Sequence, residues 1–211
     1  MSLDNEIDSI IIKGSITKHE KLAEILKLVI DKCEIDQSKY FILGSYALRE
    51  HRTISDLDIS MFYKEFDKLY KLGIGEFQLY NKQIRWFYDL TEKYKEVDPG
   101  ATDFSIEVFR KCLDEGFPNE NFSLGKLLEK NGLDVDKYGH QFFSLDTLLD
   151  WKTTMGRDKD KPDIELIRQI QSSASSKPQG GSMGMSHDKL YHKYIKYKKR
   201  YTNLKRELFS E

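Results

Sequence analysis

The sequence predicts an α+β or α/β protein in which helices surround a small mixed sheet. Two observations favour this fold class. Short apolar segments, several with the alternation of a half-buried strand, recur between residues 40 and 109. Segments with apolar residues at helical spacing lie before and after that region. With 39% hydrophobic residues the 211-residue chain can bury a core, and we expect one domain over residues 1–171.

The individual elements follow from the spacing of their apolar residues. Residues 7–13 have the apolar character of a short strand or an apolar lead-in, and a short helix is expected from the Gly44-Ser45 pair to residue 49. Strands are expected at residues 40–43, 57–62, 76–80, 83–88 and 104–109, with a tight hairpin turn at Asn81-Lys82. Longer helical patterns occupy residues 17–32, 65–72, 124–130, 145–155 and 164–171.

The C-terminal part of the chain has a different character. Residues 172–186, SSASSKPQGGSMGMS, predict a flexible linker. In residues 187–211, Leu and Tyr recur at spacing 4-3-4-3-4 with basic residues between them, which is a heptad pattern. An isolated helix this short is marginal, so we expect a coiled-coil homo-oligomer or a protein partner, with nucleic-acid binding as the alternative. Its composition is similar to that of tails on giant-virus proteins, which makes a viral origin one possibility.

The overall charge gives no reason to expect nucleic acid. The chain carries 34 Lys and Arg against 35 Asp and Glu, although residues 187–211 have a local net charge of +5. Cys33 and Cys112 have no metal-binding or disulfide spacing, which favours a reducing compartment. The N-terminal residues lack a signal-peptide pattern, and no apolar run approaches 18 residues. We therefore expect a soluble, cytoplasmic protein with no membrane contact, in the host cytoplasm if the protein is viral.

Residues 41–59, FILGSYALREHRTISDLDI, contain the pattern that points to chemistry. Glycine lets the backbone approach a ligand closely, and the N–H groups that open a helix attract anions. Asp56 and Asp58 are two residues apart, so on one strand they point to the same face and repel each other. A divalent metal would offset that repulsion, since magnesium binds one or two carboxylates together with substrate phosphates. Taken singly, the glycine turn and the aspartate pair are each common without such a role.

Gly44-Ser45, ten intervening residues and then Asp56-Leu57-Asp58-Ile59 resemble the signature of the nucleotidyltransferase superfamily related to DNA polymerase beta. The likeness is closest to small stand-alone members, including antitoxin–toxin and aminoglycoside-modifying types. The resemblance implies that Gly44, Ser45 and Ser55 hold the nucleotide. It also implies that Asp56 and Asp58 bind two Mg²⁺ ions, for which Mn²⁺ can substitute.

The same resemblance implies a third carboxylate on a neighbouring strand. Glu107, in TDFSIEVF, lies within the expected strand on the face of Ser105, whereas Phe104 and Ile106 face the other way. Asp103 shares that face only if the strand begins earlier, so Glu107 is preferred and Asp103 stays open. Glu107 would help to hold one metal ion and accept the proton of the attacking hydroxyl. The alternative is a solvated glutamate on an edge strand.

Four cations, Lys152, Arg157, Lys159 and Lys161, gather near the end of one predicted helix and the start of the next. The segment is similar to one that follows the catalytic core in several small transferases, which implies that Lys152 contacts a phosphate. The alternative is that Arg157 and Lys159 complement a helix C-terminus and pair with Asp160 and Asp163.

Other side chains have a simpler preferred interpretation. Arg52 is close enough in sequence to reach a triphosphate, but a surface loop position is favoured. Arg85, Trp86 and Tyr88 are candidates to stack on a base, but an aromatic hairpin strand more often packs a core. His140 has no partner visible in the sequence and is expected to be structural.

The sequence thus predicts a magnesium-dependent enzyme that moves a nucleoside monophosphate from a nucleoside triphosphate to a hydroxyl. The acceptor is RNA or tRNA, a protein or a small molecule, and the sequence does not choose among them or specify the nucleotide. The alternative is a catalytically idle nucleotide- or RNA-binding module of the same fold that recruits partners through residues 187–211.

Overall fold

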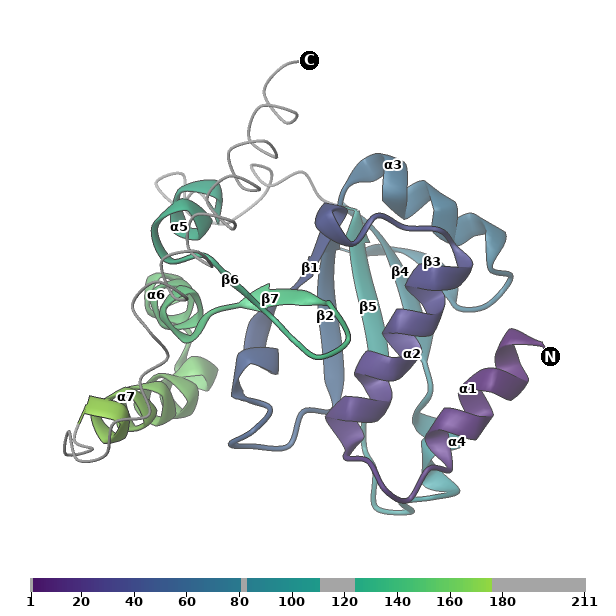
Figure 1. The fold of residues 1–211 in the computed structure, drawn as a ribbon, viewed down its shortest axis with the longest axis horizontal. Coiled ribbons are helices and arrows are strands. Elements are labelled where there is room, and N and C mark those ends of the chain that lie inside the picture. The colour runs from purple at the N-terminus through teal and green to yellow at the C-terminus, as the bar shows by residue number, and fades with distance from the viewer. Residues whose placement is uncertain (1, 81–82, 111–123, 176–211) are drawn as a thin grey trace, which may run out of the picture. The chain divides into compact units, whose positions relative to one another are not determined.

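The computed structural model describes residues 2–80, 83–110 and 124–175 (Figure 1). The chain divides into two units, Met1–Ile170 and Gln171–Glu211. The first unit is an α+β structure built on a seven-stranded mixed sheet, so the predicted fold class is confirmed at this level. The predicted linker, apart from its first four residues, and the heptad-patterned tail lie outside the described residues.

The strand order of the sheet is β3-β4-β5-β2-β1-β7-β6. The strands are β1 (Tyr40–Ile42), β2 (Asp56–Met61), β3 (Glu76–Tyr80), β4 (Gln83–Asp89), β5 (Ser105–Arg110), β6 (Leu133–Val135) and β7 (Gln141–Phe143). Two neighbouring pairs, β2 with β5 and β1 with β7, are parallel, and the other pairs are antiparallel. The five strands expected from the sequence are all present. The two that were not expected, β6 and β7, are only three residues long.

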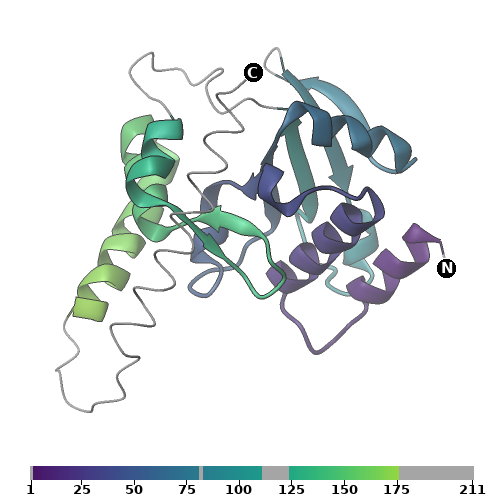
Figure 2. The same ribbon diagram turned by 45° about the horizontal axis from the view of Figure 1, so that its top comes forward.

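One face of the sheet is buried under the N-terminal helices α1 (Leu3–Ile11) and α2 (Lys18–Lys32) (Figures 1 and 2). The expectation of a strand or apolar lead-in at residues 7–13 is wrong, because these residues lie mostly in α1. Ser2 caps this helix, and Ile7, Ile10 and Ile11 recur at helical spacing and are buried. Helix α2 agrees with the prediction, and Thr17 closes its start with a capping box.

The remaining helices form two groups. Helices α3 (Tyr63–Phe66) and α4 (Thr91–Lys95) are single turns beside the large core, and α4 was not expected. Helices α5 (Leu124–Asn131), α6 (Leu145–Met155) and α7 (Lys161–Ser175) lie together at the β1–β7–β6 end of the molecule (Figures 1 and 2). Helix α7 begins three residues before its expected start and continues four residues into the predicted linker.

The described residues build two hydrophobic cores that meet at β1. Tyr40 and Ile42 pack into the large core under α1 and α2, whereas Phe41 points to the other face and packs with residues of α5, α6 and α7. His140 is fully buried, as expected for a structural histidine: its Nδ1 lies 2.6 Å from the Tyr40 hydroxyl and its Nε2 lies 2.9 Å from the Ala23 carbonyl. None of the helices in the described part of the chain has the length and apolar character needed to span a bilayer.

Candidate functional site

A pocket of about 250 Å³ lies where the two cores adjoin. It is lined by Leu43, Gly44, Ser45, Arg52, Asp56, Asp58, Trp151, Lys152, Arg157, Lys159, Asp160 and Asp163. Three separate segments supply these residues: the turn after β1 with the loop that holds Arg52, the start of β2, and the chain from the end of α6 to the first turn of α7. The structure therefore brings most of the sequence-predicted site residues to one hollow.

Asp56 and Asp58 lie on the same face of β2. The residues that alternate with them, Leu57 and Ile59, are fully buried in the large core, so the two carboxylates point to the opposite face. Gly44 stands directly beside them, with a positive φ of 64°, and a Cβ atom placed on it would lie 3.8 Å from Asp58 Oδ2. The glycine turn and the aspartate pair therefore share one wall of the pocket.

Crowding changes the protonation of Asp58. Burial raises its pKa to about 7, and the negative charges of Asp56 and Glu107 add to the effect, while Lys159 opposes it. The protonated and ionised forms of Asp58 are thus about equally populated in the metal-free protein at neutral pH. A cation placed among these carboxylates would relieve the repulsion.

Glu107 stands next to Asp58 on the neighbouring strand. The parallel register of β2 and β5 pairs Asp58 with Glu107 and Asp56 with Ser105, so Glu107 projects on the same sheet face as the two aspartates. Asp103 precedes β5 and accepts a hydrogen bond of 2.9 Å from the Ser105 hydroxyl. Burial raises the pKa of Asp103, and the Asp56 charge adds to the rise, so Asp103 also lies within the field of this cluster. Both candidates for the third carboxylate therefore remain near β2.

Three of the donors that line the pocket converge on a single carboxylate oxygen. Oδ2 of Asp163 accepts from the Ser45 hydroxyl at 3.0 Å and from Arg52 Nη2 at 3.2 Å, and Lys152 Nζ lies 3.0 Å from it. Arg52, expected as a surface loop residue, thus contributes to the pocket. Lys152 is only 4% exposed, and Asp160 Oδ1 accepts a second bond of 2.8 Å from its ammonium. The ammonium of Lys152, predicted to contact a phosphate, is therefore paired with two carboxylates of the protein itself, Asp160 and Asp163.

Asp160 is the second buried acid of this wall. Arg157 donates to both of its oxygens, from Nε at 2.6 Å and from Nη2 at 3.2 Å. Burial acts to raise the pKa of Asp160, but the hydrogen bonds from Arg157 and Lys152 outweigh it and lower the pKa. The pairing of Arg157 with Asp160 agrees with the alternative interpretation of this segment.

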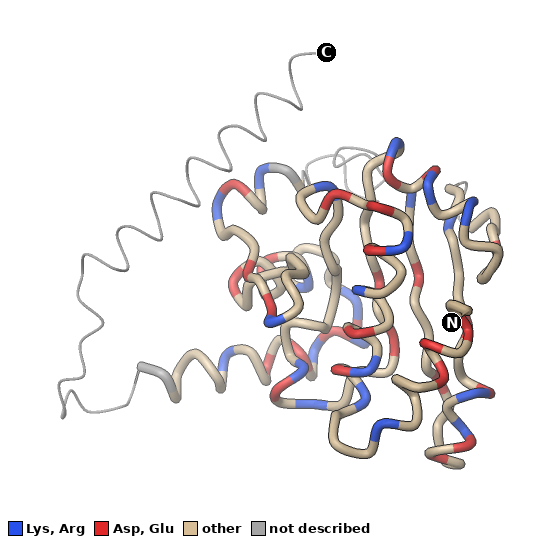
Figure 3. The backbone as a smooth tube through the Cα atoms, turned by 45° about the vertical axis from the view of Figure 1, so that its right-hand side comes forward, with Lys and Arg blue, Asp and Glu red and all other residues tan. Residues whose placement is uncertain are grey.

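The pocket has two walls of opposite character. The α6–α7 wall presents three cations, Lys152, Arg157 and Lys159, with two carboxylates, Asp160 and Asp163. Arg52 adds a fourth cation from the loop before β2, so this side of the pocket carries excess positive charge. The β2 wall carries Asp56 and Asp58. Elsewhere in the described chain, positive and negative residues are interspersed along the backbone (Figure 3). A metal–polyphosphate complex has the matching distribution of charge, with a cation at one end and anionic oxygens at the other.

Some predicted residues lie apart from the pocket lining, and Glu107 and its alternative Asp103 are among them. Ser55 is not among the lining residues; its carbonyl accepts a bond of 3.3 Å from the Ser105 amide and ties the start of β2 to β5. Trp86 and Tyr88 are buried on the core face of β4, in agreement with the preferred interpretation. Lys161 pairs with Asp158 at 2.8 Å, and both side chains are exposed.

Sequence reasoning missed the full part played by Asp163 and did not single out Trp151. Asp163 was considered only as an ion-pair partner, whereas it connects the Ser45 turn to α6 and α7. The signal available was its place in the first turn of a predicted helix, where an acid at N3 commonly caps. Trp151 precedes Lys152, and its ring stacks under Arg157, whose guanidinium carbon lies 5.7 Å from the ring centre.

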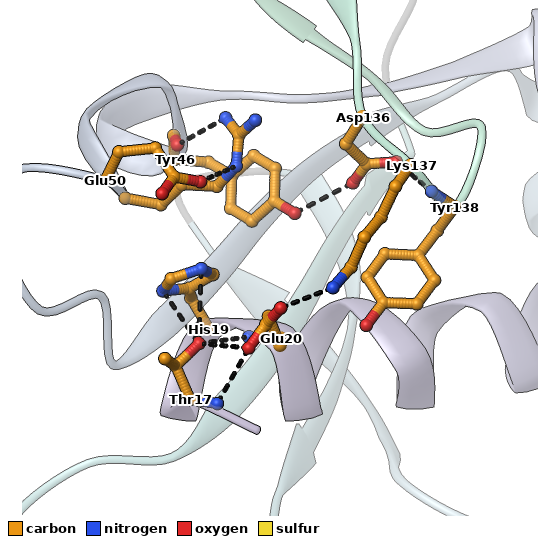
Figure 4. Close-up of polar contacts among 9 residues, drawn as sticks. Thr17, His19, Glu20, Tyr46, Glu50, Asp136, Lys137 and Tyr138 are labelled. Atoms are coloured by element: carbon orange, nitrogen blue, oxygen red, sulfur yellow. Dashed lines mark hydrogen bonds and ion pairs between the residues drawn. The ribbon is translucent and has the colours of Figure 1, made fainter. Parts of the chain in front are cut away.

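A second, smaller hollow of about 180 Å³ lies between the start of α2, the turn at Tyr46–Glu50 and the β6–β7 loop (Figure 4). Its ionised groups are satisfied by one another. Lys137 pairs with Glu20, and the Tyr46 hydroxyl donates to Asp136 at 2.8 Å. These contacts fasten α2 to the β6–β7 loop, so we assign this hollow a structural role.

Comparison of the chain with protein-family models, with curated proteins and with solved structures found no match in any of the three.

Proposed function

We propose that this protein is a metal-dependent nucleotidyltransferase that moves a nucleoside monophosphate from a nucleoside triphosphate to a hydroxyl acceptor. One observation carries the proposal: two crowded carboxylates on β2 face a glycine–serine turn and a cationic wall across one pocket. Neither the carboxylate pair nor the cations would be informative alone. Together they provide complementary partners for a metal ion and for a polyphosphate.

The residues present fit a magnesium ion in their chemistry. Asp56 and Asp58 offer hard oxygen donors. Burial and the charges of Asp56 and Glu107 raise the pKa of Asp58, an effect that a bound cation would counteract. The described residues contain no group of three or more His, Cys, Asp or Glu side chains arranged to hold a metal ion. The predicted ligand set of Asp56, Asp58 and Glu107 is therefore not preformed among the described residues. Magnesium commonly binds through one or two carboxylates, with substrate phosphates and water completing its shell, so we propose Asp56 and Asp58 as its first ligands and Glu107 as a third that joins when substrate is bound. When bound, magnesium would stabilise negative charge on the reacting phosphates and activate the acceptor hydroxyl.

The other wall would bind the triphosphate. Lys159 is exposed, and the Arg52 side chain is 43% exposed, so both can turn a donor toward a phosphate. Ser45 has one hydroxyl proton and gives it to Asp163, so its bond to a phosphate requires release from that carboxylate. Lys152 contributes positive charge from below the surface of the pocket.

Glu107 is the proposed base for the acceptor hydroxyl, with Asp103 as the alternative. The acceptor would approach the side of β5 and β2 that carries Glu107 and Asp58, and it is an RNA or tRNA end, a protein or a small molecule. Residues 187–211 would supply a homo-oligomer or protein contact. We place the reaction in the cytoplasm, the host cytoplasm if the protein is viral.

Transfer of label from α-phosphate-labelled nucleoside triphosphates tests the proposal. Each of the four nucleotides is incubated with the full chain, magnesium and separate RNA, protein and metabolite fractions, and the labelled fraction identifies the acceptor class. Asp58→Ala should fold normally and lose activity by about 10³-fold or more, because it removes a charge that acts directly on the reacting groups.

Asp150→Ala is the matched control, since Asp150 lies on α6 outside the pocket and pairs with Lys130 at 2.7 Å. It should transfer label like the wild type. Wild-type activity in Asp58→Ala would refute the catalytic assignment.

A further inference from the structure

Glu107 is held by an arginine from the next strand. Nη1 of Arg85, on β4, donates to Oε2 of Glu107, on β5, at 2.5 Å. Both side chains are largely buried, at 16% and 21% exposed, so water screens this pair less than a surface pair. Glu107 lies in register with Asp58, so Arg85 acts on the carboxylate cluster through one intermediate residue.

The guanidinium of Arg85 is itself fixed in place. Gln78 Oε1, on β3, accepts from Nε at 3.2 Å and from Nη2 at 2.8 Å. The rings of Tyr80 and Phe87 lie 4.4 Å and 4.9 Å from its central carbon, which restrains the plane of the group. Strands β3, β4 and β5 therefore combine to present one N–H of Arg85 to one oxygen of Glu107.

We propose that Arg85 is a positioning residue that fixes the Glu107 carboxylate beside Asp58 and leaves its second oxygen, Oε1, for the metal ion or the acceptor hydroxyl. The inference rests on the proposed function and extends it to β4. Within the described residues Oε1 has no hydrogen bond, whereas Oε2 is held by Arg85. The planar guanidinium is already oriented by its other contacts, so it loses little conformational entropy when it binds a carboxylate. Arginine therefore suits this position better than lysine.

The competing explanation is an ion pair that only stabilises the sheet. Arg85→Lys separates the two, because it keeps the positive charge but cannot hold Gln78 and Glu107 with one planar group. Loss of a residue that orients a metal ligand commonly weakens metal binding 10- to 100-fold. We therefore expect Arg85→Lys to bind Mn²⁺ about 10-fold more weakly than the wild type, measured on the full chain by electron paramagnetic resonance of free Mn²⁺ with no nucleotide present.

Kinetics provides a second readout. The nucleotide would be held mainly by the α6–α7 wall, so Arg85→Lys should lower kcat for transfer about 10-fold and leave the KM for the nucleotide unchanged. Arg110→Lys is the matched control: Arg110 also pairs with a carboxylate, Asp67, and stacks on a tyrosine, Tyr63, at the far end of β5. It should leave both Mn²⁺ affinity and kcat unchanged.

The outcomes separate the two proposals. Equal Mn²⁺ affinity in Arg85→Lys and the wild type would overturn the positioning role and leave the proposed function intact. A wild-type chain that neither binds Mn²⁺ nor transfers label would overturn both. If Arg85→Lys does not fold, Gln78→Ala replaces it, since this change frees the guanidinium without removing charge; unchanged Mn²⁺ affinity there would likewise overturn the inference.

Discussion

Among the described carboxylates, Asp58 has the most strongly raised pKa. The Leu57 and Ile59 side chains bind β2 firmly to the large core, which forces Asp58 to the opposite face beside Asp56. Burial and two carboxylate neighbours raise its pKa to about 7. Holding a buried carboxylate beside two others destabilises the metal-free protein. Such destabilising arrangements are common at functional sites, where residues are selected for activity and not for stability.

The raised pKa of Asp58 predicts a pH dependence of stability. Because the folded-state pKa is above the ordinary value of 3.8, folded protein retains a proton that the unfolded chain has already released. This contribution is complete below pH 4, declines as the pH rises, and is lost above pH 7. The free energy of unfolding is measured by urea titration in the presence of a chelator, for the wild type and for Asp58→Asn, between pH 5 and pH 8. Over this range the wild type should lose on the order of a few kcal/mol more than Asp58→Asn.

Asp150→Asn serves as the comparison for that titration. Hydrogen bonds from Lys130 and Asn131 lower the pKa of Asp150, so it stays ionised over the whole range. Its stability should follow that of the wild type in slope. Parallel curves for Asp58→Asn and the wild type would show that Asp58 titrates normally.

At the scale of elements, the segment from the end of α6 to the start of α7 is fastened by buried charge. Asp160 is 1% exposed and accepts from both Lys152 and Arg157. Removing one partner of a buried ion pair costs roughly 3–5 kcal/mol when the other charge is left uncompensated. In Asp160→Asn, Lys152 keeps its second partner, Asp163, at 3.0 Å, and Arg157 is partly exposed to water. The variant should therefore lower the free energy of unfolding by less, about 1–3 kcal/mol in urea titration, the cost of losing hydrogen bonds to charged groups.

Asp158→Asn tests whether burial is the cause. Asp158 lies in the same turn and pairs with Lys161, but its side chain is 94% exposed. Exposed pairs contribute about 0–1 kcal/mol, so this variant should remain close to the wild type. A similar loss in both variants would mean that the turn itself, rather than the buried charge, is sensitive.

The elements with strong periodicity were predictable from sequence and the short ones were not. The alternation of Leu57 and Ile59 with polar residues identified β2, and the 3.6-residue period of α2 identified that helix. Residues 7–13 were misread because a short apolar run fits a strand or a helix equally well, and the Ser2 cap was not used to decide. Strands β6 and β7 have three residues each, too few for a period to appear.

The candidate site was predictable only in part, because many of its contacts join segments that are far apart in the sequence. The sequence identifies acids two residues apart on one strand, and it suggests a partner on another strand. Contacts between distant segments depend on the register and on helix packing: Asp163 reaches Ser45 across 118 positions of sequence, and Arg85 reaches Glu107 from the adjacent strand. The sequence around each of these residues does not indicate which residue will be its partner.

For the molecule as a whole, ligand binding tests whether the protein takes up a metal–nucleotide complex, and label transfer then separates the enzyme from an idle nucleotide-binding module. A ligand that binds only the folded state stabilises it by about 2.7 kcal/mol at 100 times its Kd. Magnesium together with the correct nucleoside triphosphate should therefore raise the Tm by roughly 5–10 °C. Removal of magnesium with a chelator should reverse most of the increase, as measured by thermal denaturation.

The comparison arms are the nucleotide without metal and the metal-plus-nucleotide mixture with Asp58→Ala. Both should shift the Tm much less than the complete mixture with wild type. A flat response of the wild type would favour a binding module that does not take up nucleotide. Binding without label transfer would indicate a nucleotide-binding protein with no catalytic step.

The three-residue strand β1 has a mechanical consequence. Tyr40 and Ile42 belong to one hydrophobic core and Phe41 to the other, so the aspartates and the cations that face them are anchored in different bodies of packed side chains. The width of the pocket then depends on how these two cores pack against each other, and a substitution such as Phe41→Leu, which changes no charged group, would alter that width. We therefore expect apolar substitutions in β1, where the two cores meet, to change activity although they alter no residue of the pocket wall.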